Sequence, residues 1–448
     1  MNKPNVIIIL MDTLRKDAFD KWIENYTGKY KNIIKNSFKF DNAIAPSSWT
    51  LPSHFSLFTG LYPSEHGVHK LYPTDRYMDL IERSNTYLGE FLMDFALENG
   101  YYTSGFIANA VVSYSGIASH FNSLIRPKFL SHSKFSPVVF LSQENFKKYS
   151  NLERGYKKAA FIIKNSPLKS SIFLSRFLVD ISILKLIRNP TYKNYNELLS
   201  QFIQNIKFNS SQFIFFNFME MHEPYLKFSD FTKFQLEHIF RYNDANNKIR
   251  KFREIYFNQI NKITTIFDTI ISKLIEEKQL DNSIVIITSD HGQAFNEHGY
   301  LGHSIYNYDE ISKIPLFIYA PKYLIDAKSY NKNINTNLVN LYDFIKEIII
   351  DGKSSIGKLK SDIVLCETFG IVNNLSKYEK RDNFKEIIGK IDIPRKSLFK
   401  NDIKLTLNGD GKVEEFNGTE ADYKELIEYL SIFNVDKYFK IPVDNVKI

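Results

Sequence analysis

The sequence "NVIIILMD", residues 5–12, begins as a run of branched apolar side chains and ends at an aspartate. Residues 6–10 are apolar without alternation, which is typical of a parallel strand buried on both faces. Four more runs share this character: "TSGFIA" at 103–108, "QFIFFNF" at 212–218, "SIVIIT" at 283–288 and "PLFIYA" at 315–320. We expect these five runs to be strands of one parallel sheet.

Segments with a helical period lie between these runs. They cover residues 86–100, 194–207 and 257–277, and the first ends at Gly100, a residue that commonly ends helices. The alternation of strands and helices predicts an α/β fold, with a doubly wound, mostly parallel sheet flanked by helices.

The pattern divides the chain into a catalytic domain, residues 1–350, and a small C-terminal α+β subdomain, residues 351–448. In the subdomain, "SDIVLCETFG" at 361–370 and "DIKLTLNGDGKVEEFNG" at 402–418 predict a small sheet with an NGDG hairpin turn. A final helix is expected near residues 422–433.

Residues 110–160 are rich in Ser, Phe, Lys and Tyr and have little periodicity. We expect the region 110–190 to be an insertion over the edge of the sheet that lines a substrate channel. Within it, Ile172 to Ile187 is apolar but interrupted by charged residues, and it is shorter than the roughly 20 apolar residues of a membrane span. An amphipathic surface helix is expected there, which leaves peripheral membrane contact open.

The chain has 448 residues, a net charge of +8 and one cysteine. A basic surface favours anionic partners, although a biased composition with a solvated surface explains the excess equally well. No dense Lys/Arg block with interleaved aromatics is found, so nucleic-acid binding is not expected. Cys366 cannot form an intrachain disulfide and is expected to be a small buried side chain near a strand.

The N-terminal apolar run is too short for a signal peptide and ends at Asp12 without a small-residue cleavage site. We therefore expect no signal peptide, no transmembrane helix and a cytoplasmic location.

Polar residues follow three of the predicted strands. Asp12 ends the first run, Glu220 and His222 follow the third, and Asp290 and His291 follow the fourth. Ligands of open α/β sheets bind at the carboxyl ends of the strands. An aspartate and a histidine at such a strand end suit a metal ion, since they offer oxygen and nitrogen donors. An aspartate that caps an ordinary turn is the alternative.

Thr50 lies in "APSSWTLPSHFSLFTG", residues 45–60, where a loop turns into a predicted helix. Pro52 fits the first helical turn, and a threonine helix cap is worth about 1 kcal/mol. The functional alternative is a hydroxyl activated by a metal ion, next to helix N–H groups that suit an anionic phosphoryl or sulfuryl group.

Four motifs together resemble the sulfatase family of the alkaline phosphatase superfamily. They are "NVIIILMDTLRKD" at 5–17, "APSSWTLPSHFSLFTGLYPSEHGVH" at 45–69, "FNFMEMHEPY" at 216–225 and "SDHGQAFNEHGYLGHSIYNYDEISKIPLFIYAP" at 289–321. They occur in the family's order, whereas the C-terminal hundred residues match only in general layout. The resemblance implies an alkaline-phosphatase-like fold.

The resemblance also implies a set of metal-contacting residues: Asp12, Thr50, Asp290 and His291. Thr50 falls at the nucleophile position, and His222 and His303 fall where the family holds substrate oxygens or the leaving group. A structural role for either histidine is the alternative.

Four further charged or titratable residues lie within these motifs or directly after one of them. Glu297 and His298 are expected to shape their loop. Arg15 and Lys70 could neutralise an anion, and solvated charges explain them equally well.

The chain departs from the family at three positions. Sulfatases generally carry a Cys or Ser that becomes formylglycine, followed by Pro and Arg, whereas this chain has Thr50 and His54. Threonine cannot yield the aldehyde because its β-carbon carries a methyl group, so no formylglycine is expected. The usual pair of acids after the first strand is Asp12 and Thr13 here, one carboxylate fewer.

These residues predict a metal-dependent hydrolase that cleaves a sulfate or, given Thr50, more readily a phosphate (di)ester through a covalent threonine intermediate. One divalent ion is expected, with Ca, Mg, Mn and Zn left open. The substrate is expected to be an anionic ester, with a glycan or lipid head group as candidates. Alternatives are a transferase of phosphoethanolamine or glycerol phosphate that modifies a cell-surface glycan or lipid, and a non-catalytic binding module.

Overall fold

The computed structural model describes residues 3–72, 74–75, 77–127, 193–225, 234–235, 237–240, 246–372, 375, 379–380 and 382–432. Most of the expected insertion at 110–190, including the 172–187 stretch, lies outside the described residues. Among the helices of the described part, none combines the length and the apolar character that crossing a membrane requires.

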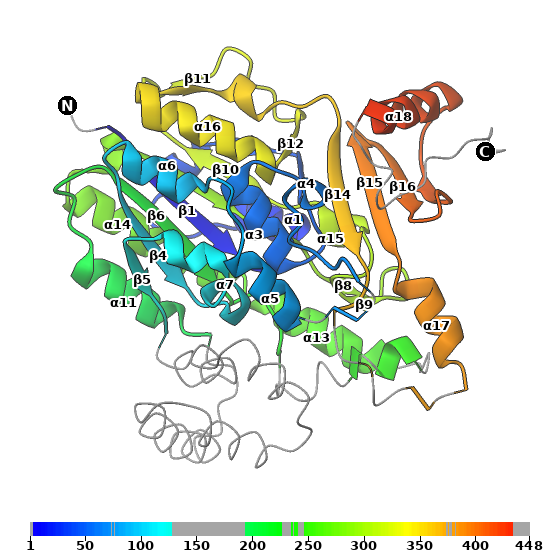
Figure 1. The fold of residues 1–448 in the computed structure, drawn as a ribbon. Coiled ribbons are helices and arrows are strands. Elements are labelled where there is room, and N and C mark those ends of the chain that lie inside the picture. The colour runs from blue at the N-terminus through cyan, green and yellow to red at the C-terminus, as the bar shows by residue number, and fades with distance from the viewer. Residues whose placement is uncertain are drawn as a thin grey trace, which may run out of the picture.

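A seven-stranded sheet forms the centre of the molecule, in the order β2-β10-β7-β1-β6-β4-β5 (Figure 1). Its strands are β1 (Asn5–Met11), β2 (Phe38–Phe40), β4 (Tyr102–Ile107), β5 (Ser123–Ile125), β6 (Gln212–Phe218), β7 (Ser283–Thr288) and β10 (Leu316–Tyr319). β1 lies in the middle and pairs in parallel with β6 and β7. The five apolar runs are therefore confirmed as strands.

The expected direction of the last run is wrong, because β10 pairs antiparallel with both β7 and β2. A parallel connection would need a crossover that carries the chain back to the other edge of the sheet. The one helix within residues 289–314 is the four-residue α15 (Asp309–Ser312), too short for such a crossover, so the chain re-enters the sheet from the edge where β7 ends.

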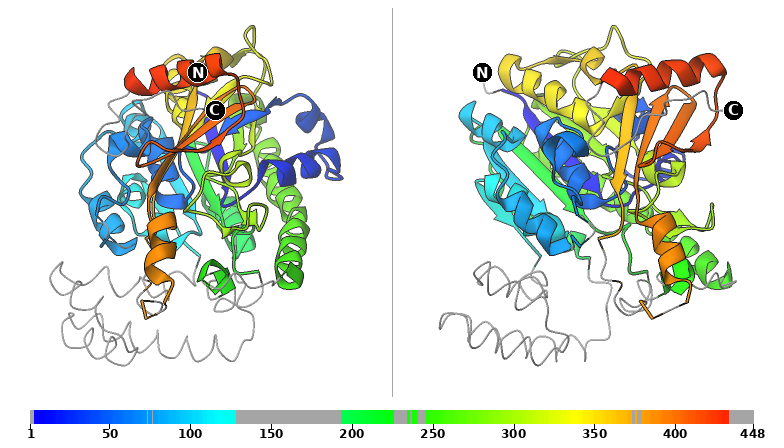
Figure 2. Two further views of the ribbon diagram at one scale, coloured as in Figure 1. Left: turned by 90° about the vertical axis from the view of Figure 1, so that its right-hand side faces the viewer. Right: turned by 45° about the vertical axis from the view of Figure 1, so that its right-hand side comes forward.

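Helices cover both faces of the sheet, as the edge-on view in Figure 2 shows. Side chains of alternating β1 residues pack on α3 (Thr50–Thr59), α6 (Leu92–Glu98) and α16 (Leu338–Asp351) on one face. The others pack on α1 (Lys16–Glu24), α11 (Tyr195–Asn205), α13 (Asn246–Asn258) and α14 (Asn261–Glu276). Burial on both faces explains why the strands are apolar without alternation, and it confirms the predicted α/β fold.

The remaining elements are short. They are helices α2 (Lys31–Lys35), α4 (Pro63–His66), α5 (Tyr77–Asn85) and α7 (Ala110–Ser113); 3₁₀ turns η1 (Gly116–His120), η4 (Leu280–Asn282) and η5 (Ile356–Leu359); and the strand pairs β3 (Asn42–Ile44) with β12 (Asn335–Asn337), β8 (Ala294–Phe295) with β9 (Leu301–Gly302), and β11 (Ile325–Asp326) with β13 (Ser354–Ser355).

Two predicted helix boundaries need correction. The helix expected at 86–100 begins only at Leu92, although Gly100 follows it with a φ of +86°. The helix expected at 257–277 is two helices, since α13 ends at Asn258 and α14 begins at Asn261. The helix expected at 194–207 is confirmed as α11, with the Asn194 side chain accepting from the N–H of Glu197.

The C-terminal residues form a second, antiparallel sheet beside the first (Figure 1). Its strands are β14 (Val364–Phe369), β15 (Pro394–Lys400), β16 (Ile403–Asn408) and β17 (Val413–Phe416), with helices α17 (Phe384–Ile391) and α18 (Glu420–Ile432). The predicted hairpin and final helix are confirmed, and Cys366 is buried in β14. β15 was not predicted, because its buried residues include Arg395 and Lys396.

Side chains of this second sheet hold the loop after β9. Arg395 donates from Nη1 to the carbonyl oxygen of Ile305 at 3.3 Å, and Thr368 donates from Oγ1 to that of Ser304 at 2.6 Å. The N–H of Ser304 donates to the carbonyl oxygen of Ser48, 2.8 Å away in the loop before α3. The C-terminal sheet thus fixes the loop that carries His303.

Candidate active site

The carboxyl ends of β1, β6 and β7 lie next to one another at one edge of the sheet, because these central strands are parallel neighbours. Asp12 continues the pairing by donating its N–H to the carbonyl oxygen of Phe218 at 2.9 Å. His222 follows β6 and the pair Asp290–His291 follows β7. The structure therefore brings together Asp12, His222 and the pair Asp290–His291, which sequence analysis placed at three strand ends.

Asp12, Asp290 and His291 form a first cluster, in which one donor atom of each residue lies within 4.8 Å of the others. All three are fully buried. Asp12 Oδ2 accepts from Asn109 Nδ2 at 2.7 Å, and Asp290 Oδ1 accepts from the N–H groups of Thr13 and His291 at 3.2 and 3.0 Å. The second carboxylate oxygens, Asp12 Oδ1 and Asp290 Oδ2, have no hydrogen-bond partner among the described residues.

The tautomer of His291 suits a metal ligand. Its Nδ1 donates to the carbonyl oxygen of Gly292 at 2.9 Å, so Nε2 keeps its lone pair. That Nε2 lies 3.4 Å from Asp290 Oδ2 and 4.0 Å from Asp12 Oδ1, the two oxygens without a partner. Two buried oxygens and one buried nitrogen thus converge on one point.

The electrostatics of the cluster call for a cation. Burial, and then the neighbouring Asp290, raise the pKa of Asp12; burial raises the pKa of Asp290 to about 7. Burial lowers the pKa of His291 to about 4, which keeps its imidazole neutral. Buried carboxylates without a counter-charge are costly, so these donors fit a divalent ion.

Thr50 is the first residue of α3 rather than its cap, since the N-cap position belongs to Trp49. The Thr50 hydroxyl makes no capping bond. Instead its Oγ1 lies 3.3 Å from His291 Nε2, next to the first cluster. The prediction that Thr50 is the N-cap is therefore wrong, because the N-cap is the preceding residue, Trp49. The Thr50 hydroxyl lies at the N-terminus of α3 and faces the candidate metal site.

His54 occupies the position of the family's arginine, one turn into α3, and is fully buried. It donates from Nδ1 to the carbonyl oxygen of Thr50 at 2.9 Å, and Asn217 Nδ2 donates to its Nε2 at 3.3 Å. Asn217 Oδ1 accepts from the N–H of Asn109, whose side chain bonds Asp12. A chain of buried hydrogen bonds thus connects Asp12 to the backbone of Thr50, and neither nitrogen of His54 is left to bind a metal.

His222, Glu223 and His303 form a second cluster with donor atoms within 4.8 Å of one another. Glu223 Oε2 lies 3.5 Å from Nδ1 of His222 and 3.9 Å from Nδ1 of His303, and it has no hydrogen-bond partner among the described residues. The clusters adjoin, because Asp12 Oδ1 lies 3.9 Å from His222 Nε2 and the rings of His291 and His303 are 4.5 Å apart.

The two histidines of this cluster have opposite pKa shifts. Burial lowers the pKa of His222, but the carboxylates of Glu223 and Asp12 outweigh it and the net shift is upward. Burial, with histidine neighbours, lowers the pKa of His303 well below its ordinary value.

The other charged residues considered in the sequence lie outside the two clusters. Arg15 is bound in ion pairs with Asp17 and Glu297, at 2.9 and 2.5 Å. Lys70 pairs with Asp392 at 2.5 Å. Neither is a solvated charge, and both are already paired.

Glu220 accepts from the N–H of Tyr195 at 3.1 Å and belongs to neither cluster. Glu297 shapes its loop, as expected, by accepting from the N–H of Phe295 at 2.5 Å. His298 stacks on Tyr308 with ring centroids 4.2 Å apart.

Sequence analysis missed three residues of the site: Asn109, Asn217 and Glu223. Asn109 directly follows a buried apolar run, the rule that found Asp12 and Asp290. Asn217 is a polar residue inside "QFIFFNF", which is itself a signal. Glu223 gave no comparable signal.

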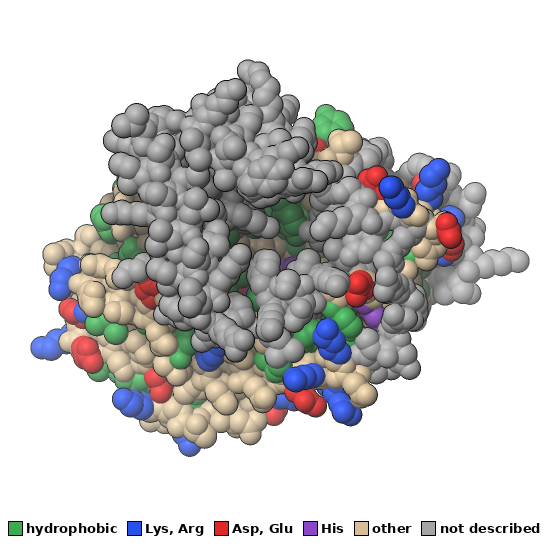
Figure 3. Space-filling model, turned by 90° about the horizontal axis from the view of Figure 1, so that it is seen from below, with side chains coloured by type: hydrophobic (Ala, Val, Ile, Leu, Met, Phe, Trp, Pro, Cys, Tyr) green, Lys and Arg blue, Asp and Glu red, His purple; other side chains and the backbone are tan. Residues whose placement is uncertain are grey.

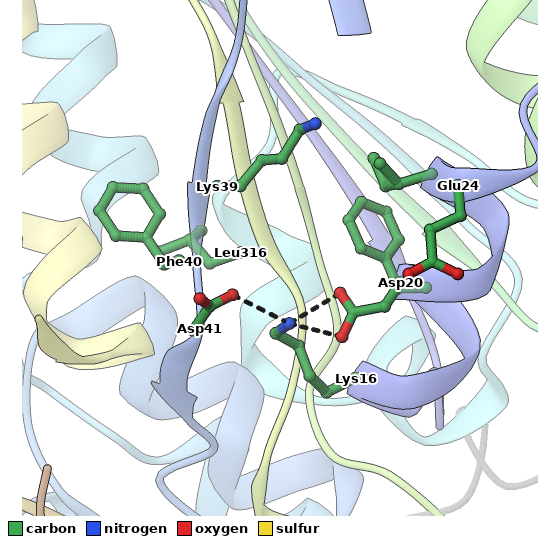
Figure 4. Close-up of a pocket in the computed structure, with 9 residues that line it drawn as sticks. Lys16, Asp20, Glu24, Lys39, Phe40, Asp41 and Leu316 are labelled. Atoms are coloured by element: carbon green, nitrogen blue, oxygen red, sulfur yellow. Dashed lines mark hydrogen bonds and ion pairs between the residues drawn. The ribbon is translucent and has the colours of Figure 1, made fainter. Parts of the chain in front are cut away.

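A surface pocket of about 270 Å³ lies between α1 and β2 and contains none of these residues. Figure 4 shows Lys16 bridging Asp20 and Asp41 across it, at 2.7 and 3.5 Å. On the face seen in Figure 3, acidic and basic side chains of the described residues are mixed rather than gathered into a patch of one sign.

The fold and the first cluster define an alkaline-phosphatase-like α/β protein with a candidate metal site at the strand ends. The family model described as Sulfatase matches residues 4–349, and the chain belongs to this family. The motifs that sequence analysis used to infer the family therefore led to the correct assignment.

Individual relatives are distant. The chain is 23% identical to human iduronate 2-sulfatase over 363 residues, which cover 71% of this chain and 60% of that protein. It is 21% identical to an arylsulfatase of Clostridium perfringens, covering 73% of this chain and 70% of that one. The phosphonate monoester hydrolase from Silicibacter pomeroyi has a similar structure, with a TM-score of 0.60 at 15% identity over 98% of this chain and 96% of that chain. The chain thus spans less than two thirds of the human relative.

Proposed function

We propose that this protein is a metal-dependent hydrolase that cleaves a phosphate or sulfate ester, with Thr50 as nucleophile. The observation that carries the proposal is the position of Thr50 Oγ1, 3.3 Å from His291 Nε2 and beside two unpartnered carboxylate oxygens. Membership of the sulfatase family and the similar phosphonate monoester hydrolase support hydrolysis of an ester of this kind.

Asp12, Asp290 and His291 would hold the divalent ion. When bound, the ion supplies Lewis-acid chemistry, because it lowers the pKa of a hydroxyl group and offsets charge on substrate oxygens. The N–H groups of Thr50 and Leu51, the first two residues of α3, suit the anionic oxygens of the substrate.

The reaction has two halves. In the first, Thr50 Oγ would pass its proton to solvent and form a bond to phosphorus or sulfur, while the bond from that atom to the leaving oxygen breaks. His222 or His303 would supply the proton that the leaving oxygen takes up. In the second, water would attack the same atom and return a proton to that histidine, and Thr50 Oγ would leave and regain a proton from solvent.

Thr50 favours phosphate over sulfate as the ester. A formylglycine hydrate has a second hydroxyl that helps to expel the bound group, whereas threonine has one oxygen and its β-carbon carries a methyl group. The Thr50 ester must therefore be released by attack at the central atom, which phosphoryl groups undergo readily at metal sites. We propose that no formylglycine forms.

Nitrophenyl phosphodiester and nitrophenyl sulfate, assayed side by side, test the proposal. Thr50→Ala should lower kcat by at least about 10³-fold, while Thr59→Ala, at the other end of the same helix, should leave kcat unchanged. Mass spectrometry of the quenched enzyme should find the added group on Thr50. Unchanged turnover in Thr50→Ala would refute the proposal, and burst release without turnover, relieved by an added glycan or lipid alcohol, would indicate a transferase instead.

A further inference from the structure

We infer that His222, Glu223 and His303 bind a second divalent cation next to the first cluster. Two imidazoles and one carboxylate are a known donor set of catalytic zinc. The presence of this site does not depend on the proposed reaction; only its role in that reaction rests on the proposed function.

The distances within the cluster are close to those of a coordinated ion. Two donors that are each about 2.1 Å from one tetrahedral ion lie about 3.4 Å apart. Glu223 Oε2 lies 3.5 Å from Nδ1 of His222 and 3.9 Å from Nδ1 of His303. All three donor atoms lie within 4.8 Å of one another.

The two Nδ1 atoms now donate to carbonyl oxygens, each at 2.7 Å: Glu223 O for His222, and Gln293 Oε1 for His303. An ion bound through Nδ1 would replace these two acceptors, and each ring proton would move to Nε2.

Charge balance is the second argument. Asp12, Asp290 and Glu223 bring three carboxylates into adjoining clusters, and no Lys or Arg nitrogen of the described residues lies within 4.0 Å of them. One divalent ion leaves a negative site, to which an anionic ester would add further charge. A second ion neutralises both.

The neighbouring cation Lys193 does not remove this need. Its Nζ lies 3.5 Å from the carbonyl oxygen of Glu220, and the Glu220 carboxylate is buried beside it. Glu220 and, to a lesser degree, Glu223 share the positive charge of Lys193, so Lys193 alone does not neutralise Glu223.

The first and second sites adjoin, because His222 Nε2 of the second cluster lies 3.9 Å from Asp12 Oδ1 of the first. With the second ion bound, His222 and His303 would be its ligands, and the ion would supply the positive partner of the leaving oxygen in place of a proton donor.

Zinc stoichiometry tests the inference. The full chain is stripped with chelator, titrated with Zn²⁺ and analysed by native mass spectrometry and elemental analysis. The wild type should bind two equivalents. Glu223→Gln keeps the size of the side chain and should bind one, with the second equivalent weakened more than about 100-fold, since loss of an outer-shell partner alone costs about 10–100-fold.

Two variants make the result specific. Glu254→Gln, at an exposed position of α13, should still bind two equivalents. Asp290→Asn should lose the other site and bind one. If Glu223→Gln does not fold by circular dichroism, His303→Asn must show the same loss of one equivalent.

A wild type that binds a single equivalent, or a folded Glu223→Gln that binds two with unchanged affinity, overturns the inference. Neither result touches the proposed function, because an enzyme with one metal ion can still use Thr50. Conversely, a protein that binds two equivalents and cleaves no ester would refute the function and keep the site.

Discussion

Replacing Asn109 by Ser should weaken metal binding at the first cluster without removing any ligand. Asn109 Nδ2 donates to Asp12 Oδ2 at 2.7 Å in a fully buried setting, and its side-chain oxygen also caps α7 by accepting from the N–H groups of Val111 and Val112. Serine is an equally good cap but is too short to reach Asp12. The substitution therefore removes one hydrogen bond to a charged acceptor.

The magnitude follows from that bond. A hydrogen bond to a buried charged group contributes about 1.5–3 kcal/mol, so the free energy of unfolding of the metal-free protein should fall by about this amount. Asp12 also becomes free to turn Oδ1 away from His291. Loss of such outer-shell partners typically lowers metal affinity about 10–100-fold, or about 1.4–2.7 kcal/mol.

Competition with a chelator of known affinity measures the dissociation constant of Zn²⁺, and urea unfolding measures stability. Asn205→Ser, at an exposed position near the end of α11, is the matched control and should change neither quantity. A zinc affinity of Asn109→Ser within threefold of wild type would refute the reasoning, even if stability falls, since the bond would then be structural only.

Glu367→Gln should lower the free energy of unfolding in urea by about 3–5 kcal/mol. The reason is that Glu367 Oε1 lies 2.6 Å from the ammonium of the buried Lys396, and the substitution removes this negative charge. A loss below about 1 kcal/mol would contradict the prediction. Burial raises the pKa of Asp75, but two backbone N–H groups and an arginine outweigh it and the net shift is downward. The ionised Asp75 carboxylate therefore stabilises the folded protein fully above about pH 5, and this contribution is lost as the pH falls below about 4. The difference in unfolding free energy between wild type and Asp75→Asn should therefore shrink as the pH is lowered through that range. Gly292→Ala places a Cβ 2.0 Å from the backbone oxygen of Glu310. This clash should destabilise the protein by roughly 1–3 kcal/mol and displace the neighbouring candidate metal ligand His291. An unchanged melting temperature would contradict the prediction.

The strands were predictable because their burial is symmetrical. Ile7 and Ile8 point to opposite helix layers and are both fully buried, so the run carries a signal at every position. The direction of β10 was not predictable from its composition, since an antiparallel strand covered on both faces has the same apolar residues. β15 was hidden for the opposite reason, because Arg395 and Lys396 are buried through ion pairs with acids from other strands.

The first cluster was predictable because each member follows a strand whose end is fixed by the sheet. Glu223 was not, since its position depends on the course of the loop after His222 rather than on a strand. The role of Asn217 depends on long-range partners, His54 and Asn109, which are 163 and 108 residues away in the chain. The sequence shows such a residue only as a polar break in an apolar run.

Two departures from the family's pattern meet at Asp290. Thr13, in place of an acid, donates its N–H to Asp290 Oδ1, and His54, in place of an arginine, has Nδ1 3.7 Å from Asp290 Oδ2. Burial lowers the pKa of His54 to about 4, so its ring is neutral at pH 7. One negative and one positive charge are therefore absent together, and the charge around Asp290 is unchanged. The two departures therefore offset each other in formal charge, and the carboxylates of Asp12 and Asp290 still depend on a bound cation.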